Sequence, residues 1–175
     1  MVPGKRDVPI HGYDEDVAFD VDRPLSESAL SRAGAEIERA HREKLRLCAA
    51  LEDVADSLPA HVDRLRCLAI AGELVPLLRS VHRYEEDVVL PAFLAALGRS
   101  PDAWASVVRL KTEHVEDECF ADELTEVLMA IGQGGRVDNP EATGFMLRGF
   151  FETLRRHIAF EREHVLPAIL TSRRL

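Results

Sequence analysis

Apolar residues recur at three- and four-residue spacing along most of the chain, starting near Ser26. β-branched residues do not alternate with polar residues over any window long enough for a strand. Spacing of this kind is typical of amphipathic helices that bury one face. The pattern therefore predicts an all-α fold.

Proline, glycine and capping residues divide the pattern into segments. Ser100 precedes Pro101 and Asn139 precedes Pro140. Each pair places a capping side chain before a proline at the first helical position, which favours a helix start. Four long helices with short links predict an up-and-down antiparallel four-helix bundle. The predicted helices cover residues 26–57, 61–97, 101–131 and 140–171.

The ends of the chain differ from its centre. Residues 1–25 contain three prolines and an acidic cluster, so we expect an irregular N-terminal arm there and assign the bundle to residues 26–172.

Pro76 falls inside the second segment, where it is expected to kink the helix or to mark a late start.

Composition narrows the classes of function. The chain of 175 residues has a net charge of −9 and a pI near 5.3, which disfavours nucleic acid as a partner. It has no apolar run long enough to span a bilayer. Three cysteines without framework spacing fit a reducing compartment and are expected to be buried packing residues. We expect a soluble, cytoplasmic protein that does not bind membranes.

Histidine and glutamate occur together more often than chance predicts. With 7 histidines and 18 glutamates in 175 residues, random placement gives about 7 × 18/175, or 0.7, histidines with a glutamate four residues later. A separation of four puts both side chains on one helix face. Three such pairs lie in the predicted helices, namely His82 with Glu86, His114 with Glu118, and His157 with Glu161.

Each predicted helix also carries one histidine on its apolar face. If the bundle is antiparallel, these four imidazoles meet in one cross-section. Buried carboxylates are costly unless they are paired or bound to a metal. Imidazoles combined with carboxylates suit divalent first-row ions, with iron favoured and manganese or zinc as alternatives. The four histidines are His41, His82, His114 and His157.

An internal repeat links the second and fourth segments. The stretch from His82 that ends in Leu90-Pro91 is similar to the stretch from His157 that ends in Leu166-Pro167. Together with His41 and His114, these elements resemble the hemerythrin-like, or HHE cation-binding, domain. The resemblance implies a four-helix bundle around a non-haem di-iron centre. Carboxylates would bridge two iron ions and histidines would be terminal ligands.

Two positions depart from the pattern of oxygen-carrying hemerythrins. The second histidine of their third helix is replaced here by Glu118. The bridging carboxylate of the second helix has two interpretations: the four-residue rule selects Glu86, whereas alignment of the two Leu-Pro-Ala sequences matches Glu161 with Glu85. We favour Glu86 and keep Glu85 as a ligand.

The resulting hypothesis is a di-iron protein that binds or senses dioxygen, nitric oxide, peroxide or iron. The alternatives are a peroxide-consuming enzyme or di-iron oxidase, and an interaction module that binds a protein partner when its metal state changes. A ferritin-like set is a further alternative, based on Glu38 with His41 and Glu161 with His164. We assign no catalytic residue, because the chain lacks a phosphate-binding loop and a Gly-x-Ser-x-Gly motif.

Overall fold

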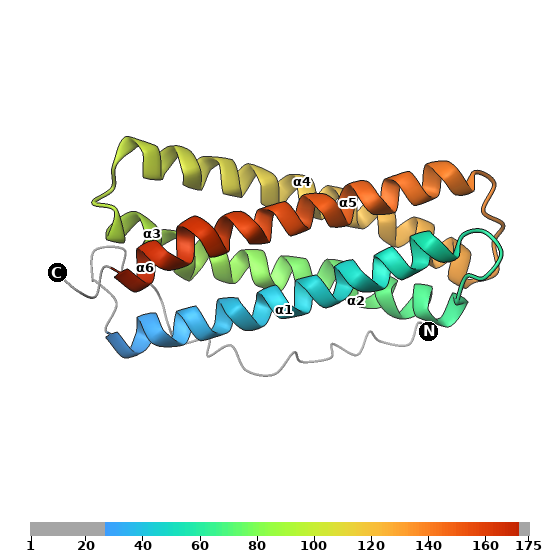
Figure 1. The fold of residues 1–175 in the computed structure, drawn as a ribbon, viewed down its shortest axis with the longest axis horizontal. Coiled ribbons are helices and arrows are strands. Elements are labelled where there is room, and N and C mark those ends of the chain that lie inside the picture. Colours follow the sequence, from blue (N-terminus) through green and yellow to red (C-terminus); the bar gives the residue numbers. More distant parts are fainter. Residues whose placement is uncertain (1–26, 172–175) are drawn as a thin grey trace, which may run out of the picture.

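The structure, a computed structural model, describes residues 27–171. The predicted arm at residues 1–25 lies outside this range. The described residues form four antiparallel helical rods, which confirms the predicted all-α bundle (Figure 1). The elements are α1 (Glu27–Ser57), α2 (Arg64–Tyr84), η1 (Glu85–Val89), α3 (Leu90–Ala96), α4 (Pro101–Gly132), α5 (Pro140–Phe160), η2 (Glu161–Val165) and α6 (Leu166–Thr171).

Two of the rods are composite. The second consists of α2, η1 and α3, and the fourth consists of α5, η2 and α6. The α1–α2 and α4–α5 links lie at one end of the bundle, and the α3–α4 link lies at the other (Figure 1). Helix α2 packs most extensively on α4, and α1 on α5. Each of the four rods therefore contributes residues to the interior of the bundle.

Side-chain caps fix the helix starts. The side chain of Ser100 accepts a hydrogen bond from the backbone N–H of Ala103 at 3.3 Å, and that of Asn139 accepts one from Ala142 at 3.0 Å. Both predicted starts are confirmed. Helix α2 begins later than predicted, because Asp63 caps it. It continues through Pro76, so the proline does not mark a late start.

Each composite rod contains a five-residue π-helical segment before a proline. The N–H of Leu90 donates to the carbonyl of Glu85, and the N–H of Leu166 donates to that of Glu161, five residues back in both cases. Pro91 follows directly and has no N–H with which to continue the α-helical bonds. A wider turn accommodates this loss, and such turns are frequent at functional sites. The two π segments begin at Glu85 and Glu161, which are both buried.

The apolar core is divided into two clusters. One contains Leu51, Leu74 and Leu124 near the α1–α2 link, and the other contains Leu90 and Leu110 towards the α3–α4 link. Between them lies a layer of buried polar side chains. This layer contains His41, Lys44, His82, Glu85, His114, Asp117, His157 and Glu161.

Two further expectations concern the surface. Within residues 27–171, no helix has both the length and the apolar character of a membrane span. Cys48 and Cys67 are buried as expected, but Cys119 is exposed because its position on α4 faces away from the core.

Candidate metal centre

The histidines of the four rods meet in the polar layer. The rings of His82 and His114 are stacked with their centroids 4.1 Å apart and their planes at 7°. The ring of His157 lies 5.1 Å from that of His114. His41 joins the layer through Glu161, whose Oε2 is 2.8 Å from its Nε2. All four side chains are almost completely buried.

Three of these imidazoles are held from outside by carboxylates on other rods. The Nδ1 of His82 contacts Glu118 at 3.0 Å, and the Nδ1 of His114 contacts Glu86 at 2.9 Å. The Nδ1 of His157 lies 3.4 Å from Glu113. A carboxylate at one nitrogen fixes the orientation of the ring and directs the other nitrogen away, as is usual for metal-binding histidines. Here the other nitrogen is Nε2, on the interior side.

The interior nitrogens lack hydrogen bonds. Nε2 of His82, His114 and His157 are all buried without a hydrogen-bond partner. Burial, together with the neighbouring His114 and Lys44, lowers the pKa of His82 far below its usual range, so its ring is neutral. Unpaired buried polar atoms are rare in folded proteins and call for an explanation such as a bound ion. Neutral imidazole is also the form that binds metals.

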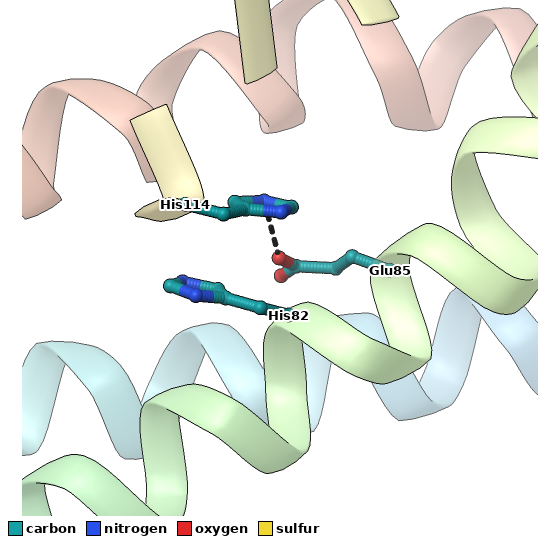
Figure 2. Close-up of side chains that lie close together, drawn as sticks. All are labelled: His82, Glu85 and His114. Carbon is teal, nitrogen blue, oxygen red and sulfur yellow. Dashed lines mark ion pairs between the residues drawn. The ribbon is translucent and has the colours of Figure 1, made fainter. Parts of the chain in front are cut away.

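The inward carboxylates come from the two π segments. Glu85 Oε2 is 3.1 Å from His114 Nε2, and this contact is drawn in Figure 2. The Glu85 side chain points towards the edge of the two stacked rings of His82 and His114 (Figure 2). Glu161 Oε1 is 3.8 Å from His157 Nε2. Neither Glu85 Oε2 nor Glu161 Oε1 has a hydrogen-bond partner.

A lysine lies between these two carboxylates. Lys44 Nζ donates to Glu85 Oε1 at 2.8 Å and is 3.6 Å from Glu161 Oε2, with its side chain fully buried. Burial alone lowers the pKa of Lys44, but the charges of Glu85 and Glu161 outweigh it and raise that pKa above its usual value. Burial alone would raise the pKa of Glu161, but Lys44, His157 and His41 hold it well below its usual value. Lys44 and Glu161 are therefore charged together.

Two neighbouring groups complete the layer. Burial raises the pKa of Asp117, whose carboxylate lies 3.7 Å from His157 Nδ1. Burial lowers the pKa of His114, but its contacts with Glu85 and Glu86 outweigh burial and raise it.

The structure differs from the sequence analysis at two glutamates expected to point inward. The side chain of Glu86 is 32% exposed and that of Glu118 is 29% exposed. Glu86 does not share the interior face with His82 but supports His114 from outside. Glu118 does not point into the layer beside His114 but supports His82. The π turn explains the first difference, because it begins at Glu85 and directs that residue inward.

The ferritin-like set is not brought together. Glu38 and His164 are both exposed, and the ring of His164 packs against Phe160 on the surface. Of the predicted ligands, the structure gathers six residues in and around the interior layer and leaves two, Glu86 and Glu118, at its outer edge. The six are His41, His82, Glu85, His114, His157 and Glu161.

Sequence reasoning missed Lys44 and Asp117. Both lie three residues after a histidine, as Glu85 does, and a spacing of three also places side chains on one helix face. Each inward histidine is followed by at least one charged residue at three or four positions. The search for glutamate at four positions alone excluded these two residues.

Two overlapping groups of side chains have the composition of a metal site. The first is His82, Glu85 and His114, and the second is His41, Glu85 and Glu161. The ligand atoms within each group lie within 4.8 Å of one another. Imidazole nitrogen and carboxylate oxygen suit divalent iron, manganese or zinc. The residues present therefore fit a metal ion, and Glu85 is common to both groups.

Comparison with known proteins gives one match. The family model of the hemerythrin HHE cation binding domain matches residues 33–169. Neither the curated proteins nor the solved structures gave a match.

Proposed function

Because the chain belongs to the hemerythrin HHE cation-binding family, we propose that it holds non-haem iron in the buried layer and uses it to bind or sense a small ligand. The observation that carries this proposal is the set of five buried ligand atoms without hydrogen bonds. The ligands are three Nε2 atoms and two carboxylate oxygens, from His82, His114, His157, Glu85 and Glu161.

The ligands proposed are small because the layer is enclosed. Apolar clusters pack on both sides of it, and the four histidines are nearly inaccessible to water. A site of this kind excludes bulky substrates and bulk water. An iron ion bound there supplies redox chemistry and an electrophilic position for dioxygen, nitric oxide or peroxide.

The chain's own residues set the conditions for that chemistry. Glu118, Glu86 and Glu113 keep the imidazoles oriented through Nδ1. The hydrogen bonds of Glu118 to His82 and of Glu86 to His114 also make these two rings better electron donors. The Lys44 ammonium lies between Glu85 and Glu161 in the buried layer and compensates their negative charge.

Metal analysis with matched histidine variants tests the proposal. The full chain is loaded with ferrous iron under anaerobic conditions, freed of unbound metal and analysed by plasma mass spectrometry. His157→Ala is expected to lose iron, because it removes an interior nitrogen. His164→Ala, about two turns further along the same rod and exposed, is expected to retain it. Equal iron content in the two variants, or none in the unaltered protein, would contradict the proposal.

Optical titration of the ferrous protein with nitric oxide, and of the ferric protein with azide, tests for an open position on the metal. A new absorption band that saturates at a fixed ratio of ligand to iron supports ligand binding. Peroxide consumption is measured on the same sample, because sustained turnover would identify an enzyme instead of a sensor.

A further inference from the structure

The two carboxylates between the rods each face two ways. Glu85 directs Oε1 to Lys44 at 2.8 Å and Oε2 towards His114 at 3.1 Å. Glu161 directs Oε2 towards His41 at 2.8 Å and Lys44 at 3.6 Å, and Oε1 towards His157 at 3.8 Å. Both carboxylates are thus arranged as bridges between two positions. Lys44 occupies one position, and the stacked imidazoles surround the other.

Five buried ligand atoms without a hydrogen bond lie on the imidazole side. They are Nε2 of His82, His114 and His157, Oε2 of Glu85 and Oε1 of Glu161. On the lysine side, Glu85 Oε1 bonds to Lys44 and Glu161 Oε2 bonds to His41. The carboxylate oxygens that face Lys44 therefore have protein partners, whereas the carboxylate oxygens that face the imidazoles have no hydrogen bond.

We infer that the centre holds a single metal ion on the imidazole side, and that the Lys44 ammonium takes the second cation position between Glu85 and Glu161. This inference rests on the function proposed above and specifies the number of ions. It replaces the two-ion centre expected from the family resemblance.

Distance supports the assignment. A metal bound to Glu85 Oε1 at about 2.2 Å would lie no more than about 5 Å from Lys44 Nζ, because that nitrogen is 2.8 Å from the same oxygen. The ammonium and the ion would repel each other in a site with little water to screen them. The side chain of Lys44 is fully buried, so the ammonium cannot be solvated where it lies.

Charge supports it as well. Three carboxylates are buried in the layer, those of Glu85, Asp117 and Glu161, and Lys44 is the only lysine among the buried residues of the described chain. The ammonium and one divalent ion together match three negative charges. A second divalent ion would leave the layer with an excess of positive charge, which is costly in a dry interior.

The test counts manganese ions in the full chain. Protein stripped with a chelator is equilibrated with Mn²⁺, freed of excess metal and examined by plasma mass spectrometry and electron paramagnetic resonance. The unaltered protein is expected to bind one ion per chain with the six-line spectrum of an isolated Mn²⁺. Lys44→Met, which is neutral and similar in length, is expected to bind two ions, a twofold increase with an exchange-coupled spectrum. Lys44→Gln serves as a second neutral variant.

Arg42→Met is the matched control, because Arg42 is an exposed cation on the same helix. It is expected to bind one ion. Two coupled ions in the unaltered protein would overturn the inference while supporting the proposed function. A single ion in each folded Lys44 variant would also overturn it. Absence of bound manganese and iron from all of the proteins would instead refute the proposed function.

Discussion

Replacing Glu85 with glutamine should destabilise the metal-free protein much more than the same change at Glu86. The two residues are adjacent in sequence but differ in surroundings. Glu85 is fully buried and contacts Lys44 at 2.8 Å and His114 at 3.1 Å. Glu86 is 32% exposed and contacts His114 at 2.9 Å and Lys111 at 3.1 Å.

The magnitudes follow from burial. Removing one partner of a buried ion pair costs about 3–5 kcal/mol, because the other charge stays buried. For Glu85→Gln we expect about 3 kcal/mol, at the lower end, because Glu161 remains 3.6 Å from Lys44. A part-exposed ion pair contributes about 1 kcal/mol or less, which is the loss expected for Glu86→Gln. In a domain of this size, about 3 kcal/mol lowers the melting temperature by roughly 6–12 °C.

Urea unfolding followed by circular dichroism, with a chelator present, measures the free energy of unfolding of Glu85→Gln and of Glu86→Gln. The slope of the free energy against urea concentration must stay constant across the variants for the comparison to hold. Equal losses of stability in Glu85→Gln and Glu86→Gln would refute the assignment of Glu85 to the interior. A stable Glu85→Gln would show that Lys44 does not depend on that carboxylate.

The remaining predictions concern the cap of α5, the cysteines, pH and the metal. Asn139→Ala removes the helix cap and should cost about 1 kcal/mol in urea unfolding, whereas an unchanged midpoint would show that the cap is dispensable. Iodoacetamide at pH 8 should label the exposed Cys119 but not Cys67 or Cys48, which are both buried. Burial also raises the pKa of the Cys48 thiol to about 11. Mass spectrometry identifies the labelled cysteines. The depressed pKa of Glu161 stabilises the metal-free fold above about pH 4.5, and this contribution is lost as the pH falls below that value. The free energy of unfolding in urea, measured between pH 6 and 3, should therefore depend less on pH in Glu161→Gln than in the unaltered protein. Chelation should lower the melting temperature by roughly 5–11 °C if free metal had been at about 100 times its dissociation constant, and no shift would argue against a metal bound to the folded state.

The bundle was predictable because its signals are local. Ser100 and Asn139 each cap a helix and precede a proline, and both helices start where the sequence indicates. The convergence of four histidines follows from their apolar faces and the antiparallel order of the rods. The predicted start of α2 at residue 61 was wrong, because the cap is Asp63, which has no following proline to mark it.

The choice between Glu85 and Glu86 could not be made from helical periodicity. Residues three and four positions after His82 share its face in a regular helix. The π turn before Pro91 selects Glu85, and the internal repeat carried this information by aligning Glu85 with Glu161. Lys44 was missed because a lysine on an apolar face usually extends to water, whereas here two carboxylates from other rods hold it inside.

The most direct test of the centre is a crystal structure of the iron-loaded full chain, with anomalous diffraction data collected on both sides of the iron absorption edge. An anomalous peak between His82, His114 and Glu85, within ordinary bonding distance of their unpaired atoms, is the predicted result. Bound iron found only on the protein surface, or an interior without an anomalous peak, would contradict the proposal that these side chains bind iron.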